Sequence, residues 1–386
     1  MKAEKWQDKL CQVLEKPLLS YETVIRACDK LSRRIGNGDY GRHIQKMGLD
    51  GWVGEKDLLV AARAISKEVL AGRVERELGE RASEKRVRFP LGVLLHISAG
   101  NVAGLGAYSV VEGLLAGNVN LLKPSSYDNG VSAFLLKELV CLEPELRPYI
   151  YIFSLPSKRQ REIGKLASMA DAVVVWGGDG AIRGVRSFVG PDKKLIEWGN
   201  KLSFAYVSEA GMEDEEKIRG LAVHIGETQQ RLCSSCQEIF LDTEKKEKAE
   251  VFARRLVGQM EKIYEGCDMG TAVQAALRNQ AFALEDAMHG QVLFRVGGCP
   301  IRTLPRRQLI RRLRGMPISL QTAGLICSQE ERAELSYLLL RAGAVKVASP
   351  GAMTKIFGRK AHDGEYPLLR YTKVVEDTDL TPADEG

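Results

Sequence analysis

The strongest constraint on the fold of this chain is an alternation of apolar strands and helices that begins near residue 87. Short runs rich in β-branched residues predict buried strands, and stretches with helical periodicity separate them. These elements are expected at residues 92–97, 103–116, 118–122, 130–142, 149–153, 159–169, 172–176, 181–188 and 194–197. Because parallel strands need a crossover connection, this order predicts a doubly wound, mainly parallel sheet.

A second run of the same kind follows residue 209. It predicts helices at 214–228, 244–264 and 330–341, and strands at 238–241, 291–296, 323–327 and 345–348. The first 85 residues predict only helices, at 5–14, 21–34 and 55–78. We therefore expect a helical segment 1–85 that packs on a first α/β domain 86–208, a second α/β domain 209–350 and a C-terminal segment 351–386.

The composition describes an ordinary globular protein. Its 386 residues suffice for two domains, and 45% are hydrophobic and 27% charged. The densest basic cluster, at 306–314, contains no aromatic residues, which argues against nucleic-acid binding. No apolar run is long enough for a membrane span, and the first residues lack an apolar signal segment. Eight cysteines without a framework spacing favour free thiols in a reducing, cytoplasmic compartment.

Cys233 is the first candidate for chemistry. A predicted helix leads into it and a predicted strand leaves soon after it, so its sulfur can lie at the mouth of a cleft. Thiolate is the reactive form of cysteine, and nearby N–H dipoles favour it. Covalent catalysis on a carbonyl needs such a nucleophile together with donors for the oxyanion. The alternative is a buried structural cysteine, and Cys236, three residues later, leaves a redox pair open.

Polar residues follow three of the predicted strands. Asn101 can donate to an oxyanion or cap the next helix, and Glu197 can act as a general base or remain an exposed carboxylate. Lys123, followed by Pro124, Ser125 and Ser126, can hold a ribose or a phosphate or form an ordinary turn. Because ligand sites of open α/β sheets lie at the carboxyl ends of strands, these residues are candidates for one site.

Together and in this order, the motifs resemble the aldehyde dehydrogenase superfamily, and more closely its acyl-CoA reductase branch, the LuxC-type reductases of bacterial luminescence operons. The similarity covers roughly residues 85–375, and its specific segments are 96–126, 176–179, Cys233-Ser234-Ser235 and 362–364. The resemblance implies an aldehyde dehydrogenase-like α/β fold with the active site in the cleft between two domains. Residues 86–208 would bind NAD(P), residues 209–350 would carry the nucleophile, and residues 351–386 would return to the active site or an oligomer interface.

The resemblance also implies roles for individual residues. Cys233 would attack a thioester carbonyl and carry the acyl group, and Asn101 would form the oxyanion hole with the backbone N–H of Cys233. Glu197 would be the base or activator. The cofactor-binding residues would be Lys123, Ser125, Ser126, Gly177, Gly178 and Gly180. The three glycines precede a helix predicted from Ala181, where N–H groups favour a pyrophosphate.

The choice of cofactor depends on Ser126. Many NAD-using members of the superfamily have a glutamate after Lys-Pro-Ser, and this glutamate binds the ribose hydroxyls. Here Ser126 stands at that position. A carboxylate would repel a 2′-phosphate, whereas a serine hydroxyl can donate to one. Lys123 and Ser126 therefore favour NADPH, with NADH as the alternative.

The resemblance thus implies the NADPH-dependent reduction of an acyl thioester to an aldehyde through a covalent acyl-Cys233 intermediate. The substrate would be an acyl-CoA or an acyl-carrier-protein thioester, and we expect an acyl-activating partner protein and a homo-oligomer. The five histidines show no metal-binding pattern. Two alternatives stay open: NAD(P)-dependent aldehyde oxidation, in which Glu197 activates a water, and a thiol redox-sensing or binding protein that uses Cys233 and Cys236.

Overall fold

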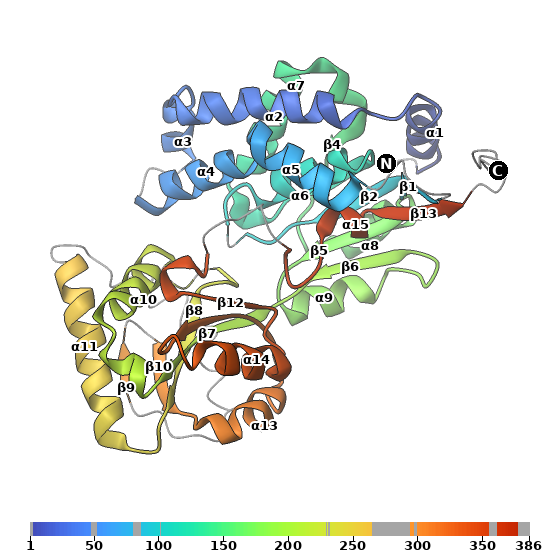
Figure 1. Cartoon of the computed structure of the whole chain (residues 1–386). Helices are drawn as coiled ribbons and strands as arrows, with labels where there is room; N and C mark the ends of the chain where they lie inside the picture. Colours follow the sequence, from blue (N-terminus) through green and yellow to red (C-terminus); the bar gives the residue numbers. More distant parts are fainter. Residues whose placement is uncertain are drawn as a thin grey trace, which may run out of the picture. The chain divides into compact units, whose positions relative to one another are not determined.

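The chain forms two compact units, shown in Figure 1. The computed structural model describes residues 3–47, 52–79, 86–100, 102–228, 230, 232–264, 294–296, 299–354 and 361–376. Unit 1 comprises Met1–Gly199 and Phe357–Gly386, and unit 2 comprises Asn200–Ile356. We expected a boundary near residue 208, but β7 (Lys201–Ser208) pairs with strands of unit 2, so the division falls between Gly199 and Asn200.

Unit 1 is built on a five-stranded sheet in which every neighbouring pair is parallel. The strands are β2 (Val93–Ile97), β3 (Val119–Lys123), β4 (Ile150–Ile152), β5 (Ala172–Trp176) and β6 (Lys194–Trp198), in the spatial order β4-β3-β2-β5-β6. The connecting helices are α6 (Leu105–Leu115), α7 (Val131–Leu142), α8 (Gln160–Ser168) and α9 (Asp179–Arg186). The predicted doubly wound parallel sheet is thus confirmed.

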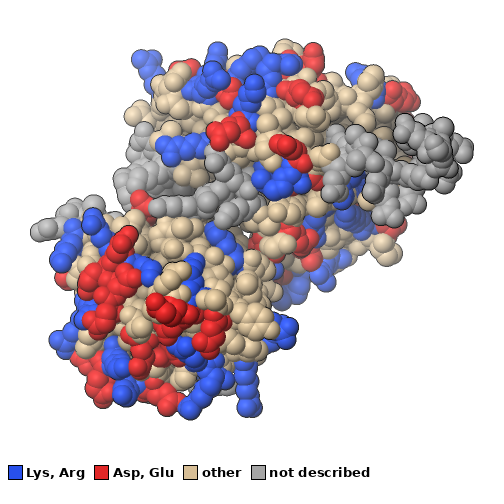
Figure 2. All heavy atoms as spheres, viewed as in Figure 1, with Lys and Arg blue, Asp and Glu red and all other residues tan. Residues whose placement is uncertain are grey.

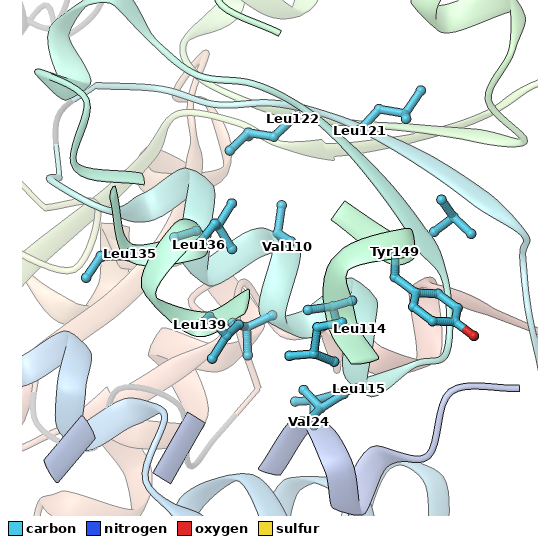
Figure 3. Packing of buried hydrophobic residues seen from close by; sticks show 14 of the residues in the cluster. Val24, Val110, Leu114, Leu115, Leu121, Leu122, Leu135, Leu136, Leu139 and Tyr149 are labelled. Atoms are coloured by element: carbon cyan, nitrogen blue, oxygen red, sulfur yellow. The ribbon is translucent and has the colours of Figure 1, made fainter. Parts of the chain in front are cut away.

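Both faces of this sheet are buried, as the continuous apolar strands predict. In β5, Val173 and Val175 belong to one buried cluster, whereas Val174 and Trp176 belong to another. Figure 3 shows part of the first cluster, to which α6, α7 and β3 contribute. Its labelled members from these three elements are Val110, Leu114, Leu115, Leu121, Leu122, Leu135, Leu136 and Leu139. Packing of this core holds the strands in place, and the candidate residues lie at the carboxyl ends of these strands.

Helices precede the sheet, as expected, but their number differs. They are α1 (Ala3–Leu14), α2 (Tyr21–Gly36), α3 (Gly41–Lys46), α4 (Trp52–Ala64) and α5 (Lys67–Leu78). The single helix predicted at 55–78 is wrong, because Ser66 is extended (φ −64°, ψ 154°) and starts a new helix at α5. Arg73 of α5 is buried and pairs with Glu112 of α6 at 2.9 Å, so the helical segment is anchored to the helices of the sheet.

The C-terminal segment belongs to unit 1 and adds a small second sheet. After α15 (Pro367–Arg370), β13 (Thr372–Glu376) pairs antiparallel with β1 (Arg86–Pro90). Neither strand was predicted, because each is short and their pairing joins segments almost three hundred residues apart along the sequence. Pro90 at the end of β1 suits an edge strand, which does not need every backbone N–H.

Unit 2 contains a six-stranded sheet in the order β12-β11-β7-β8-β10-β9, parallel except for β9. Besides β7, its strands are β8 (Cys236–Asp242), β9 (Phe294–Val296), β10 (Cys299–Thr303), β11 (Ser319–Ile326) and β12 (Lys346–Ala348). The helices are α10 (Glu215–Thr228), α11 (Lys246–Tyr264), α13 (Leu309–Arg314) and α14 (Arg332–Ala342). Short 3-10 helices lie at Ser126–Asp128, Pro144–Tyr149, Ala210–Glu213, Arg306–Gln308 and Pro350–Ala352.

The alternation of side chains along β7 shows how unit 2 is layered. Ala205 and Val207 pack into a cluster with α10 and α11, whereas Phe204 and Tyr206 pack into a cluster with α13 and α14. Strands β7 and β10 were not predicted. Strand β7 follows β6 without a crossover helix, because the two strands belong to different sheets. Residues 291–293 of the predicted strand 291–296 lie outside the described residues.

Two arginines of the cluster 306–314 are paired with carboxylates, whereas Arg311, Arg312 and Arg314 are exposed. Arg306 pairs with Asp242 at 2.7 Å and also with Glu331, and Arg307 pairs with Glu244. Figure 2 shows acidic and basic side chains interspersed on the visible face. Among the helices that the structure describes, none has the length and apolar composition to cross a membrane.

Candidate functional site

The strand-end motifs of unit 1 share one edge of its sheet. Ile97 lies in register with Lys123 on one side and with Val175 on the other, and Val175 pairs with Glu197. The carboxyl ends of β3, β2, β5 and β6 are therefore level. The chain runs from β2 outward to β3 and β4 and then returns to β5 on the other side of β2, so the strand order reverses between β2 and β5. Ligands of open α/β sheets bind at such a reversal.

Lys123 is a buried cation at this edge. Its residue is only 4% exposed, and its Nζ donates to Ser157 Oγ at 3.1 Å. Burial lowers the pKa of Lys123, and no carboxylate in the described part of unit 1 forms an ion pair with it. A buried charge without a counter-ion is costly unless a ligand compensates it. Lys123 is thus suited to a ribose hydroxyl or a phosphate, with Ser157 orienting its ammonium group.

The loops after β2 and β3 touch at Gly100. A Cβ on Gly100 would lie 2.5 Å from Ser125 Oγ and 2.6 Å from Tyr127 Cβ, so only glycine allows this approach. Ser125 Oγ accepts a hydrogen bond from Tyr127 N at 3.2 Å, and Ser126 is exposed. Asn101, the proposed oxyanion donor, lies outside the described residues. The contact at Gly100 nevertheless brings the segment before Asn101 against the Lys-Pro-Ser loop.

The three glycines after β5 have different environments. Gly177 has a positive φ of 153°, which favours glycine, and a Cβ there would lie 3.0 Å from Ala181 Cβ. Helix α9 begins at Asp179 rather than at the predicted Ala181, so Gly180 is a residue of its first turn. At Gly178 and Gly180 a Cβ would meet nothing within 4 Å. Neither glycine is needed for packing, and both leave the start of α9 open, where helix N–H groups favour an anion.

Glu197 is held in an ion pair. Both of its carboxylate oxygens accept hydrogen bonds from Arg186, from Nε and Nη2, each at 2.6 Å. This bidentate pair lowers the pKa of Glu197, chiefly through the hydrogen bonds from Arg186, although partial burial opposes the shift. A carboxylate with a lowered pKa is a weaker base. The geometry therefore opposes the role of general base that the sequence suggested, and Arg186 is a residue that the sequence did not single out.

Several residues of the matching segment 96–126 serve the fold. His96 Nε2 lies 2.9 Å from Asn120 Oδ1, and His96 Nδ1 lies 2.7 Å from Ser109 Oγ. Asn120 Nδ2 donates to the Asn118 carbonyl at 2.7 Å, so its Oδ1 must accept and His96 Nε2 carries the proton. These side chains are fully buried and tie β2 and β3 to α6.

The segment 362–364 forms a turn. His362 and Glu365 exchange backbone hydrogen bonds at 2.8 Å, and Asp363 (φ 51°) and Gly364 (φ 82°) are both left-handed. This is the two-residue hairpin geometry that Asp-Gly favours. The His362 ring lies 5.3 Å from the ring of Trp176 and 5.0 Å from that of Trp198. The turn thus covers the ends of β5 and β6.

Cys233 lies in unit 2, in a short turn between α10 and β8. Leu232 N donates to Ser235 Oγ and Ser235 N donates to the Leu232 carbonyl, each at 3.0 Å, which closes the turn around Cys233. Four other described cysteines, Cys28, Cys236, Cys299 and Cys327, are buried, whereas Cys233 is partly exposed. The predicted order of helix, cysteine and strand is what the structure shows.

Two side chains from the central strands hold Cys233. Ser203 of β7 donates from Oγ to the Cys233 carbonyl at 2.7 Å, and Gln321 of β11 donates from Nε2 to Cys233 Sγ at 3.2 Å. Both are buried, at 0% and 6% exposure. Neither was among the sequence candidates. Their strands are central to the sheet, and nothing in the sequence indicates that these side chains meet a residue in a turn that is 30 positions from Ser203 and 88 from Gln321.

Cys236 has a different environment from Cys233. It is fully buried, its Sγ donates to the Glu238 carbonyl at 3.3 Å, and its backbone N donates to His224 Nε2 at 3.1 Å. No disulfide joins the cysteines that the structure describes. Nor do three or more His, Cys, Asp or Glu side chains of the described ranges gather as metal ligands. A buried thiol that donates to a carbonyl gives little support to a redox pair.

Comparisons with known sequences agree with these features. The sequence profile of a family described as "Acyl-CoA reductase (LuxC)" matches residues 19–294 and 281–374. A long-chain acyl-protein thioester reductase of Aliivibrio fischeri is 27% identical over 154 residues, which are 39% of this chain and 32% of the relative. A relative of the same description from Photorhabdus laumondii subsp. laumondii is 28% identical over 187 residues, 45% of this chain and 39% of the relative. The matches thus span less than half of these relatives.

Solved structures show the same fold at low identity. A propionaldehyde dehydrogenase of Rhodopseudomonas palustris, with bound CoA and an acylated cysteine, has a TM-score of 0.66 and 14% identity, over 97% of this chain and 95% of that one. Aldehyde dehydrogenase 21 of Physcomitrella patens has a TM-score of 0.69 and 12% identity, over 92% of this chain and 85% of that one. These likenesses confirm the aldehyde dehydrogenase-like fold.

Proposed function

Because this chain belongs to the LuxC acyl-CoA reductase family, we propose that it reduces an acyl thioester to an aldehyde through a covalent acyl-Cys233 intermediate, with NADPH as the reductant. The observation that carries this proposal is the setting of Cys233. This partly exposed residue lies in a turn before β8, and its sulfur accepts a hydrogen bond from the Gln321 amide. A hydrogen-bond donor at sulfur favours the thiolate, which is the nucleophilic form.

The carboxyl edge of the unit 1 sheet is suited to the nicotinamide cofactor, which would supply the hydride. Lys123 provides a buried positive charge that pairs with no carboxylate in the described part of unit 1, and the hydroxyl of the exposed Ser126 can donate to a 2′-phosphate. Ser125 borders the same loop. Gly178 and Gly180 leave space for the pyrophosphate at the start of α9. These features support the predicted cofactor-binding residues and the preference for NADPH.

The chain's own groups would act in two steps. First, Cys233 thiolate attacks the carbonyl carbon of the thioester, and the thiol of CoA or of a carrier protein leaves. The oxyanion needs donors, and the proposed ones remain Asn101 and the backbone N–H of Cys233. Second, once the acyl carbon has been reduced, the bond to Cys233 Sγ breaks and the aldehyde is released. The covalent intermediate divides one difficult reaction into two easier ones.

Aldehyde oxidation is the alternative reaction of this fold, and it needs a base that activates a water for deacylation. Glu197 was the candidate for this base. Its bidentate pair with Arg186 and its lowered pKa make it a poor one, which favours thioester reduction over oxidation.

The test is a coupled assay of cofactor and product. NADPH and NADH oxidation are followed by absorbance with a panel of acyl-CoA and acyl-carrier-protein thioesters, and the aldehyde is trapped with a hydrazine. We expect aldehyde from the wild type, faster with NADPH than with NADH, and none from Cys233→Ala. If no thioester supports cofactor oxidation while an aldehyde is oxidised to its acid, the reductase proposal fails.

A further inference from the structure

Gln321 occupies an irregular position in the sheet of unit 2. In the β11–β7 ladder, Leu320 pairs with Leu202 and the next pair is Ala323 with Phe204. Gln321 and Thr322 therefore both lie opposite the single residue Ser203, which makes a β-bulge. Bulges redirect side chains and are frequent beside active sites.

A second irregularity meets the same serine from the other side. In the β7–β8 ladder, Ser203 pairs with Cys236 and the next pair is Phe204 with Glu238, so β8 contains one extra residue, Gln237. Bulges are rare in parallel sheets, yet two flank Ser203. The hydroxyl of Ser203 joins the β11 bulge to the cysteine turn, because it accepts from Thr322 N at 3.1 Å and donates to the Cys233 carbonyl at 2.7 Å.

The result is that a buried amide points at the sulfur of Cys233. Gln321 is 6% exposed, its backbone carbonyl accepts from Val345 N at 2.9 Å, and its side-chain Nε2 lies 3.2 Å from Cys233 Sγ. A thiolate can only accept hydrogen bonds, so it must face the NH2 group of the amide. Without the bulge in β11, the side chain of Gln321 would not be directed at Cys233.

We propose that Gln321 is a catalytic residue that stabilises Cys233 as a thiolate, a role that rests on the proposed function of Cys233 as nucleophile. Its amide acts at both moments when the sulfur is charged. In the first, the Cys233 Sγ–carbon bond forms while the bond to the leaving thiol breaks, and that thiol departs with its electron pair. In the second, after hydride from a nicotinamide has reached the acyl carbon, the oxygen re-forms the carbonyl and Cys233 leaves as thiolate.

The direct measurement is the pH dependence of Cys233 alkylation by iodoacetamide, quantified by peptide mass spectrometry. Peptide resolution is needed because Cys11 and Cys141 are exposed and also react. Gln321→Met keeps the shape of the side chain without its donor, and Gln321→Glu places a negative charge beside the sulfur. We expect the alkylation midpoint to rise by about one pH unit in Gln321→Met, the amount by which one hydrogen bond to a charged group shifts a titration. The midpoint should rise further in Gln321→Glu.

The alkylation rate near neutral pH is expected to change less than the midpoint. A midpoint that is one pH unit higher lowers the thiolate fraction at neutral pH about tenfold. The more basic thiolate is intrinsically about threefold more reactive, so the alkylation rate falls by about threefold. Gln308→Glu is the matched control, since it makes the same change at an exposed position of the same unit and should leave the midpoint unchanged. Thermal melting verifies that each variant is folded.

The outcomes separate this inference from the proposed function. Alkylation requires neither acyl-CoA nor cofactor, so a midpoint shift in Gln321→Met supports the amide–thiolate contact even where no reductase activity is found. In an active enzyme, kcat and kcat/KM should fall together in Gln321→Met. A midpoint in folded Gln321→Met and Gln321→Glu that equals that of the wild type overturns the inference.

Discussion

Arg186 holds both carboxylate oxygens of Glu197 at 2.6 Å, and this relationship decides how Glu197 can act. The pair lowers the pKa of Glu197, so the carboxylate is a weak base at neutral pH. We predict that Glu197→Gln lowers the steady-state rate of thioester reduction by less than about tenfold, well below the loss of about 100-fold or more expected for a general base. The same assay on Arg186→Gln should give a similar small change.

The lowered pKa of Glu197 determines in which direction the stability contribution of the Arg186–Glu197 pair changes with pH. Whatever this pair adds to stability is present above the ordinary carboxyl pKa and disappears as the pH falls through the lowered value. The pair is largely solvent-exposed, so this contribution is small. A Glu197→Gln enzyme that loses nearly all turnover, while Arg186→Gln keeps it, would restore Glu197 as a base.

Lys123 gives a prediction in which stability and binding change in opposite directions. Burial lowers the pKa of Lys123, and its recorded partner is the neutral hydroxyl of Ser157. We expect Lys123→Met to melt at a higher temperature than the wild type, because it removes a buried charge. The same variant should bind NADPH at least about tenfold more weakly, measured by fluorescence titration, because a charge-assisted contact is lost. A variant that binds NADPH as the wild type does would exclude Lys123 from the cofactor site.

Substitutions at Gly178 and Gly180 distinguish an effect on folding stability from an effect on cofactor binding. An alanine side chain at either position would not clash with a neighbouring residue, and Gly180 lies within α9. Gly180→Ala should therefore stabilise unit 1 by about 0.5–1 kcal/mol in denaturant unfolding. Gly178→Val should lower the unfolding free energy by about 1 kcal/mol or less, because Gly178 is the N-cap of α9, but weaken NADPH binding at least about tenfold, because its side chain would fill the space for the pyrophosphate at the helix terminus. Full NADPH affinity in Gly178→Val would contradict this placement of the cofactor.

His96 makes unit 1 sensitive to acid. Burial lowers its pKa from 6.5 to about 4, so the folded state keeps it neutral where the unfolded chain takes up a proton. Stability should thus fall as the pH drops from 6.5 towards 4, by up to about 3 kcal/mol at the lower end. His96→Gln keeps an N–H for Asn120 without a titrating ring, so its unfolding free energy should depend less on pH in this range.

Tryptophan fluorescence can follow this effect in unit 1 alone, because all four tryptophans belong to that unit. His224 of unit 2, whose pKa burial likewise lowers to about 4, supplies the control. His224→Gln should leave the fluorescence-detected acid dependence of unit 1 as it is in the wild type. An acid dependence that persists in His96→Gln would assign it to other groups.

The sequence predicted those parts of the fold that depend on local pattern. The continuous apolar runs of β2 and β5 predicted buried parallel strands, and both were confirmed. The break at Ser66 was missed, because helical periodicity continues on both sides of it. Strands β1 and β13 were missed because their pairing is a long-range event, and β7 because no crossover helix precedes it.

For the candidate site, too, the sequence predicted what depends on local pattern and missed what depends on long-range contacts. The sequence identified Lys123 and Cys233 from their positions next to predicted strands, and the structure places both there. It did not identify the residues that give these two their environment, namely Ser157, Ser203 and Gln321. Ser203 and Gln321 lie in central strands, where a polar residue has no local signature, and a bulge is what turns Gln321 toward the sulfur. Such contacts depend on the register of neighbouring strands.

The central claim, a covalent acyl group on Cys233, is tested most directly by intact-protein and peptide mass spectrometry of enzyme incubated with an acyl-CoA in the absence of cofactor. The account predicts one added acyl mass on the peptide that contains Cys233, none on Cys233→Ala, and its loss with release of aldehyde when NADPH is added. An active enzyme that forms aldehyde without any acylation of Cys233, or equally well as Cys233→Ala, would contradict it.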